Sequence, residues 1–182
     1  MMSAKLFTYF GAVCLISALF LLWQRSNPKR LMFSSFFPSK VETLSLKDSQ
    51  PTRLIIRNSN IDLPIIPAKV KGQNWETTTQ GVSWLINSSL PGEEGNSVIY
   101  GHNWENLLGN LISVKPGYQI EIAYKDGSKK IFTVDSTAIV SPKNISVLKQ
   151  SKDKKITLYT CAGLFDEKRF VVVAKIDKKL AN

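Results

Sequence analysis

The sequence predicts an all-β domain of about eight short strands, a barrel or a sandwich, preceded by one apolar helix. Two observations support this fold class. From Pro51 onward, apolar and β-branched runs of strand length alternate with Gly, Pro, Asn and Asp turn signals. Before that region, Leu6–Trp23 contains no charged residue. As a helix this run would be about 27 Å long, close to the thickness of a bilayer core.

The apolar run is interpreted as an uncleaved membrane anchor. Its exit, residues 21–25, has no small-x-small cleavage site, and Trp23 suits a membrane interface. A cleaved signal peptide is the alternative. The nearby cations, Lys5 before the run and three after it, leave the orientation undecided.

Three regions follow from this reading: residues 1–25 as anchor, 26–50 as juxtamembrane linker and 51–182 as the β domain. The linker mixes Pro, Ser, Lys and aromatic residues without periodicity. Its apolar segments 31–33 and 36–37 either lie at the lipid interface or cover a groove on the domain. Nothing in the sequence chooses between these two placements.

Strands are expected wherever β-branched runs meet turn signals. Pro64 and Pro67 confine the predicted strand 61–67 to a sheet edge or a bulge, because proline lacks the N–H that pairing with a neighbouring strand needs. Single-turn helices are expected within 103–113 and 142–150. The strands run, in order, over 53–57, 61–67, 82–86, 97–102, 118–124, 129–134 with a possible extension by 137–140, 155–161 and 169–176.

Composition excludes several functional classes. The net charge is +10, but the lysines are scattered through turns and no arginine-rich helix is present, so we expect no nucleic-acid partner. The two cysteines, Cys14 in the apolar run and Cys161 at a strand end, are poor disulfide partners. One histidine cannot supply a zinc cluster, and we expect no metal and no cofactor.

Cys161, His102 and Arg169 are the candidates for chemistry. Cys161 and His102 each end a predicted strand, and Arg169 begins the strand after Cys161. A neighbouring imidazole can accept a thiol proton or stabilise the thiolate, and a guanidinium can stabilise an oxyanion. The structural alternative is equally concrete, because free cysteine is often a core residue and a lone histidine often has no catalytic task.

Three motifs resemble the sortase family. Leu90–His102 resembles the Pro-Gly, Gly-Asn and Gly-His approach to the sortase histidine, and Thr157–Cys161 resembles the Thr-Leu-x-Thr-Cys signature. Arg169 matches the arginine that opens the next strand. The resemblance extends over 53–176, with weaker likeness in 61–67 and 107–117. Many relatives have arginine after the Gly-His pair, where this chain has Asn103 and Trp104.

The resemblance implies a closed eight-stranded β-barrel and a membrane-anchored cysteine transpeptidase. Cys161 would attack a backbone carbonyl of an LPxTG-like C-terminal sorting signal and form a thioacyl-enzyme, with His102 as acid and base. Arg169 would stabilise the oxyanion or hold the substrate. The implied partners are surface proteins that carry a sorting signal and an amine acceptor, from a peptidoglycan precursor or a pilin. The implied location is a single-pass cell-membrane protein with an extracellular C-terminal domain.

Substrate contacts and class are less constrained. Thr160, Trp104 and Asn103 are the candidate substrate-binding residues. The short segment after the cysteine, 162–166, resembles the housekeeping-like D, E and F types more than class B. Two other functions use the same residues differently: a cysteine peptidase that hydrolyses the same signal, and a non-catalytic, membrane-anchored β-barrel binding module.

Overall fold

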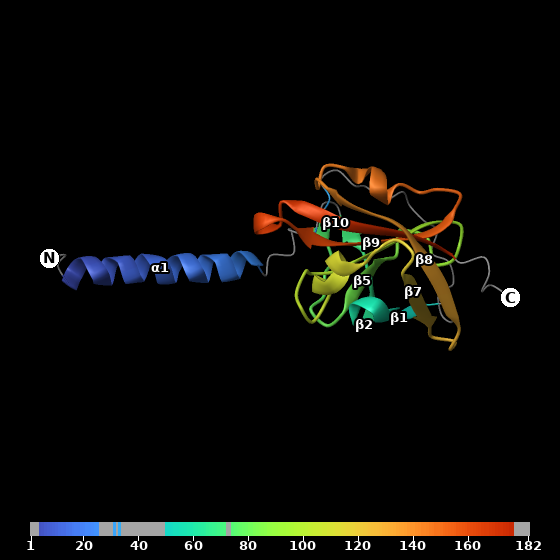
Figure 1. Ribbon diagram of the computed structural model, residues 1–182, viewed down its shortest axis with the longest axis horizontal. Helices are drawn as coiled ribbons and strands as arrows, with labels where there is room; N and C mark the ends of the chain where they lie inside the picture. The colour runs from blue at the N-terminus through green and yellow to red at the C-terminus, as the bar shows by residue number, and fades with distance from the viewer. Residues whose placement is uncertain (1–3, 26–30, 32, 34–49, 72–73, 177–182) are drawn as a thin grey trace.

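The computed structural model describes residues 4–25, 31, 33, 50–71 and 74–176. The predicted linker therefore lies outside the described residues except at Leu31, Phe33 and Gln50. An N-terminal helix, α1 (Ala4–Arg25), precedes a β domain (Figure 1). Its apolar window Leu6–Gln24 buries none of its surface within the structure, and its length and composition would allow it to cross a membrane.

The β domain is a closed barrel of eight strands, which confirms the all-β prediction. The barrel order is β1-β2-β5-β6-β9-β10-β8-β7, and pairing of β1 with β7 closes it. The strands are β1 (Pro51–Ile56), β2 (Ile61–Ala68), β3 (Val70–Lys71), β4 (Asn74–Trp75), β5 (Val82–Leu85), β6 (Gly95–Tyr100), β7 (Gln119–Tyr124), β8 (Lys129–Val140), β9 (Lys154–Ala162) and β10 (Lys168–Ile176). The 3-10 helices are η2 (Arg57–Ser59), η3 (Gly109–Ser113), η4 (Ile145–Leu148) and η5 (Leu164–Asp166).

The prolines of β2 are accommodated because each half of that strand has a partner on one side only. Ile61–Pro64 pairs with β1, whereas 65–68 pairs in parallel with β5. A proline can therefore turn its missing N–H toward the unpaired side. The expectation of an edge strand is right locally, although β2 as a whole is an internal member of the barrel.

Every second side chain along the strands points into the barrel interior and fills it. These side chains include Leu54 from β1, Ile122 from β7, Leu158 from β9 and Val172 from β10, all of them fully buried. Apolar packing of this kind is the main favourable term in folding. The residues between these point outward and face two different environments.

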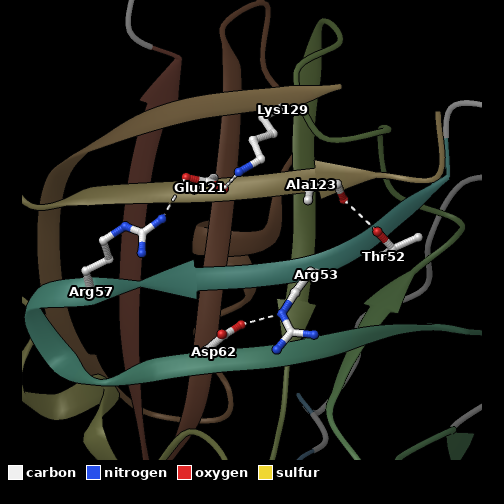
Figure 2. Close-up of polar contacts among 7 residues, drawn as sticks. All are labelled: Thr52, Arg53, Arg57, Asp62, Glu121, Ala123 and Lys129. Carbon is white, nitrogen blue, oxygen red and sulfur yellow. Dashed lines mark hydrogen bonds and ion pairs between the residues drawn. The ribbon is translucent and has the colours of Figure 1, made fainter. Parts of the chain in front are cut away.

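The outward face of β1, β2, β7 and β8 is polar and open to solvent. Figure 2 shows ion pairs between neighbouring strands on this face, Arg53 with Asp62 and Lys129 with Glu121. Arg57 also pairs with Glu121, at 3.5 Å. Exposed pairs of this kind contribute little to stability.

The outward face of β5, β6, β9 and β10 is apolar and covered. Tyr100 and Tyr159 are fully buried there although they do not point into the barrel. Part of the cover is the β3–β4 hairpin, whose Trp75 packs edge-on against Tyr100 at 5.1 Å between ring centroids. The sequence did not predict this hairpin, because its strands have two residues each. Strand β6 is therefore buried on both faces.

Asn96 joins β6 and β9 to the segment that contains η4. Its Nδ2 donates to the carbonyls of Val147 (3.1 Å) and Lys149 (3.2 Å), and its Oδ1 accepts from Thr157 Oγ1 at 2.8 Å. Asn96 is fully buried, so removing its amide would break these three hydrogen bonds. Thr157 Oγ1 would keep its hydrogen bond to Val147 O, at 3.3 Å.

We therefore expect Asn96→Ala to lower the free energy of unfolding by about 2–4 kcal/mol. Urea unfolding of the full chain in detergent measures this change. The exposed Asn110→Ala is the control and should change it by less than about 0.5 kcal/mol. Equal losses in the two variants would contradict the assigned role of Asn96.

Candidate active site

The parallel pairing of β6 with β9 brings the histidine and the cysteine to one end of the barrel. The register aligns Tyr100 with Tyr159, and their rings stack at 5.5 Å between centroids. Beyond β6, Gly101 N donates to Tyr159 O at 3.3 Å, which continues the pairing past the last strand residue. His102 and Cys161 each follow by two residues in the aligned register, so both lie at this end.

Cys161 lies on the outer, covered face of the barrel. Side chains two residues apart in a strand share a face, so the cysteine is on the same side as Tyr159. Cys161 belongs to the outer apolar cluster and is only 3% exposed. It therefore lies outside the barrel interior, beneath the residues that cover the outer face.

Arg169 is the direct cross-strand partner of Cys161. The antiparallel register of β9 and β10 pairs these two residues, which places their side chains on one face of the sheet. Arg169 is 3% exposed, and its Nη1 donates to the carbonyls of Asp166 and Lys168, both at 2.9 Å. These carbonyls hold the guanidinium at the end of the barrel where the cysteine lies.

His102 is buried and flanked by an aromatic ring. Its imidazole stacks on the Trp104 indole, with 4.5 Å between centroids and 14° between planes. Burial lowers the pKa of His102 because it disfavours the charged imidazolium, and the negative charge of Asp166 partly opposes this effect. His102 is therefore biased toward the neutral form by its surroundings.

The candidate substrate-binding residues occupy different environments. Thr160 is fully buried, and its Oγ1 donates to Gly101 O at 2.8 Å, so the hydroxyl ties the end of β9 to the end of β6. Asn103 and Trp104 are half-buried beside His102. Asn103 Nδ2 donates to Asp166 Oδ1 at 3.1 Å. A substrate contact for these three residues stays a prediction.

Leu31 and Phe33 cover the site, so for these two residues the structure favours the groove over the lipid interface. Both side chains are buried in the same cluster as Cys161. The Phe33 ring packs edge-on against Tyr159 at 4.9 Å between centroids, and the Arg169 guanidinium lies 6.0 Å from its centroid. Tyr159 donates its hydroxyl proton to Leu31 O at 3.2 Å.

Comparison with known proteins identifies the family of this chain. A family model described as the sortase domain matches residues 54–177. The chain belongs to the sortase family. Sortase A of Listeria monocytogenes is 30% identical over 112 residues, which are 59% of this chain and 50% of that protein. The chain thus spans half the length of this curated sortase.

Solved sortase structures share the fold. Sortase A of Listeria monocytogenes superposes with a TM-score of 0.58 and 25% identity, over 72% of this chain and 89% of that one. Sortase C1 of Streptococcus agalactiae, in complex with MTSET, gives a TM-score of 0.64 and 23% identity, over 90% of this chain and 87% of that one. Because the similar sortases include types A and C, the class within the family stays open.

Two features of the candidate site were not predicted from the sequence. Asp166 contacts Asn103 and Arg169, and its only sequence signal was an acid between the cysteine and the arginine. The aromatic cover formed by Phe33, Trp75, Tyr100 and Tyr159 brings together four distant segments, so no local pattern could reveal it.

Burial of His102 predicts a specific pH dependence of stability. The ordinary pKa of histidine is about 6.5, and the folded value lies below it, so the unfolded chain binds a proton first as the pH falls. The free energy of unfolding should therefore decrease from about pH 6.5 downward, relative to His102→Gln. Urea unfolding of both full chains in detergent at several pH values measures the difference, and a pH-independent difference would contradict burial of a neutral imidazole.

The cover predicts that Phe33→Ala exposes the thiol. Loss of the packed ring should weaken the cover and raise the rate at which iodoacetamide alkylates Cys161, by roughly tenfold or more. The Phe33→Ala variant and its parent both carry Cys14→Ser, which removes the second thiol. Ile139→Ala, at a residue that is 62% exposed, is the control and should leave the rate unchanged. Equal rates in the Phe33→Ala and parent chains would show that Phe33 does not shield the sulfur.

Proposed function

We propose that this sortase is a cysteine transpeptidase that cleaves a sorting signal and transfers the acyl part to an amine. The observation that carries the proposal is the position of Cys161 directly opposite Arg169, at the barrel end where His102 also lies. A thiol, an imidazole and a guanidinium in one buried site are the groups that acyl transfer requires.

In the first half-reaction, the Cys161 thiolate attacks the scissile carbonyl carbon. The carbon–oxygen double bond opens, and the negative charge that develops on oxygen is stabilised by the Arg169 guanidinium. His102, as imidazolium, gives its proton to the leaving amine as the carbon–nitrogen bond breaks. The product is a thioester between the sulfur of Cys161 and the substrate acyl group.

In the second half-reaction, neutral His102 takes a proton from an incoming amine, which attacks the thioester. Collapse of the tetrahedral intermediate releases the thiolate and leaves a new amide. Water in place of the amine would give hydrolysis with the same residues. Exclusion of water by the buried site favours the amine, because Cys161, His102 and Arg169 are each at most 6% exposed.

The proposed setting is the outer surface of a cell membrane, with α1 as the anchor. The helix has no charge between Leu6 and Trp23, and none of its apolar window is buried inside the structure. Residues 26–50 would then tether the barrel, proposed here as residues 51–182, close to the lipid. The proposed partners are surface proteins with an LPxTG-like signal and an amine of the cell wall or a pilin.

The test is an acyl-transfer assay on the full chain in detergent, with a library of LPxTG-like peptides and a glycine-based or lysine-based amine. Mass spectrometry should detect a thioester on Cys161 and an amide-ligated product. Cys161→Ala should abolish both, and its unchanged far-UV circular dichroism would show that the fold is intact. A Cys161→Ala chain that still ligates peptide would overturn the proposal.

The same assay separates the alternatives. A cysteine peptidase would release the free acid at the same rate with and without amine. A non-catalytic binding module would give neither adduct nor product, and Cys161 would then be only a buried strand residue. The transpeptidase predicts that added amine converts the free acid into ligated product.

A further inference from the structure

The loop between β9 and β10 contains one residue that reaches both the histidine side and the arginine side of the site. The Asp166 carboxylate accepts a hydrogen bond from Asn103 Nδ2 at 3.1 Å, and Asn103 directly follows His102. The Asp166 carbonyl accepts from Arg169 Nη1 at 2.9 Å. One residue thus bonds both to Arg169 and to the neighbour of His102.

The backbone of this loop is held in a costly conformation. Phe165 and Asp166 have φ values of +58° and +61°, a region that costs an L-residue roughly 1–2 kcal/mol and that aspartate tolerates better than most residues. The register of Cys161 with Arg169 fixes both ends of the loop. The strained pair turns the Asp166 carboxylate toward Asn103 and its carbonyl toward the guanidinium.

Asp166 also affects the pKa of His102. Its carboxylate raises the pKa of His102 against the opposing effect of burial. Among the described residues, the other buried titratable or charged groups at this end include Cys161 and Tyr159 on β9 and Arg169 on β10. Lys168, next to Arg169, is exposed. Glu105 and Glu167 are exposed to solvent, where their charges are screened.

We propose that Asp166 is a positioning residue whose carboxylate favours the imidazolium form of His102 and whose carbonyl holds the Arg169 guanidinium at the barrel end where Cys161 lies. The proposal rests on the acyl-transfer function, because that reaction needs an imidazolium for the leaving amine and a guanidinium for the oxyanion. Without the carboxylate, burial would lower the pKa of His102 further and reduce the share of imidazolium available to protonate the leaving amine.

Asp166→Asn is the informative variant. Asparagine keeps an oxygen that can accept from Asn103, it tolerates the left-handed backbone, and it removes only the charge. Asp153→Asn is the matched control, because Asp153 is exposed and lies just before β9, at the opposite end of that strand from Cys161. Asp166→Gly is the second variant, since glycine keeps the backbone conformation and removes the whole side chain.

The single histidine makes the measurement direct. NMR of the full chain in detergent micelles, labelled at histidine, follows the titration of His102 alone. A Cys161→Ala background removes the coupled titration of the thiol. We expect Asp166→Asn and Asp166→Gly to lower the titration midpoint by on the order of 0.5–1 pH unit, and Asp153→Asn to leave it within about 0.2.

A kinetic readout tests the same claim in the Cys161 chain. In the acyl-transfer assay Asp166→Asn should lower kcat by roughly threefold to tenfold, in proportion to the lost imidazolium, and leave KM for the peptide nearly unchanged. The pH profile of kcat should move in the same direction as the NMR midpoint.

An unchanged midpoint in both Asp166 variants, or an equal shift in Asp153→Asn, would overturn the positioning role. These titrations need no substrate. An inactive parent chain would therefore refute acyl transfer. If the parent chain is active but the titration midpoint of His102 is the same with and without the Asp166 substitutions, only the positioning role is refuted.

Discussion

The parallel pairing of β6 with β9 is the constraint on which the site depends. Parallel strands need a long crossover, and here the crossover itself forms β7 and β8 and so completes the barrel. The aligned register brings the two strand ends level, and the hydrogen bonds from Gly101 N and Thr160 Oγ1 extend the alignment beyond β6. A shift of one residue would turn Cys161 into the barrel interior and Leu158 out of it.

Burial of the outer face sets the electrostatic environment of the candidate site. Both faces of β6 and of most of β9 are covered. The side chains of His102, Cys161 and Arg169 therefore lie in an environment poor in water, where electrostatic effects are strong. That environment must also satisfy the buried charge. Carbonyls of Asp166 and Lys168 hold Arg169, and the Asp166 carboxylate counteracts the desolvation of His102.

Much of this arrangement was predictable from sequence, because its signals are local. The strand runs, the turn residues and the prolines of β2 gave the number and approximate bounds of the barrel strands. Two predicted segments, 129–134 and 137–140, are one strand, because β8 pairs with β10 through a register shift near Val173 that keeps the ladder continuous. Cys161, His102 and Arg169 were visible because each lies at the end or the start of a predicted strand.

What the sequence could not predict depends on contacts between distant segments. The predicted strand 97–102 ends at Tyr100, so His102 stands on irregular backbone beside Trp104. The hairpin β3–β4 is too short to give a periodic signal, yet its Trp75 buries Tyr100. The placement of Phe33 was open, because an apolar residue after a membrane helix fits lipid as well as protein.

The central claim is that the pairing of β6 with β9 makes the imidazole of His102 act on the sulfur of Cys161. The most direct measurement is the pH dependence of Cys161 alkylation by iodoacetamide, in the Cys14→Ser chain with and without His102→Ala. The account predicts that loss of the imidazole slows alkylation near neutral pH and moves the half-maximal rate to higher pH, because the thiol loses its neighbouring proton acceptor. Superimposable profiles would contradict it.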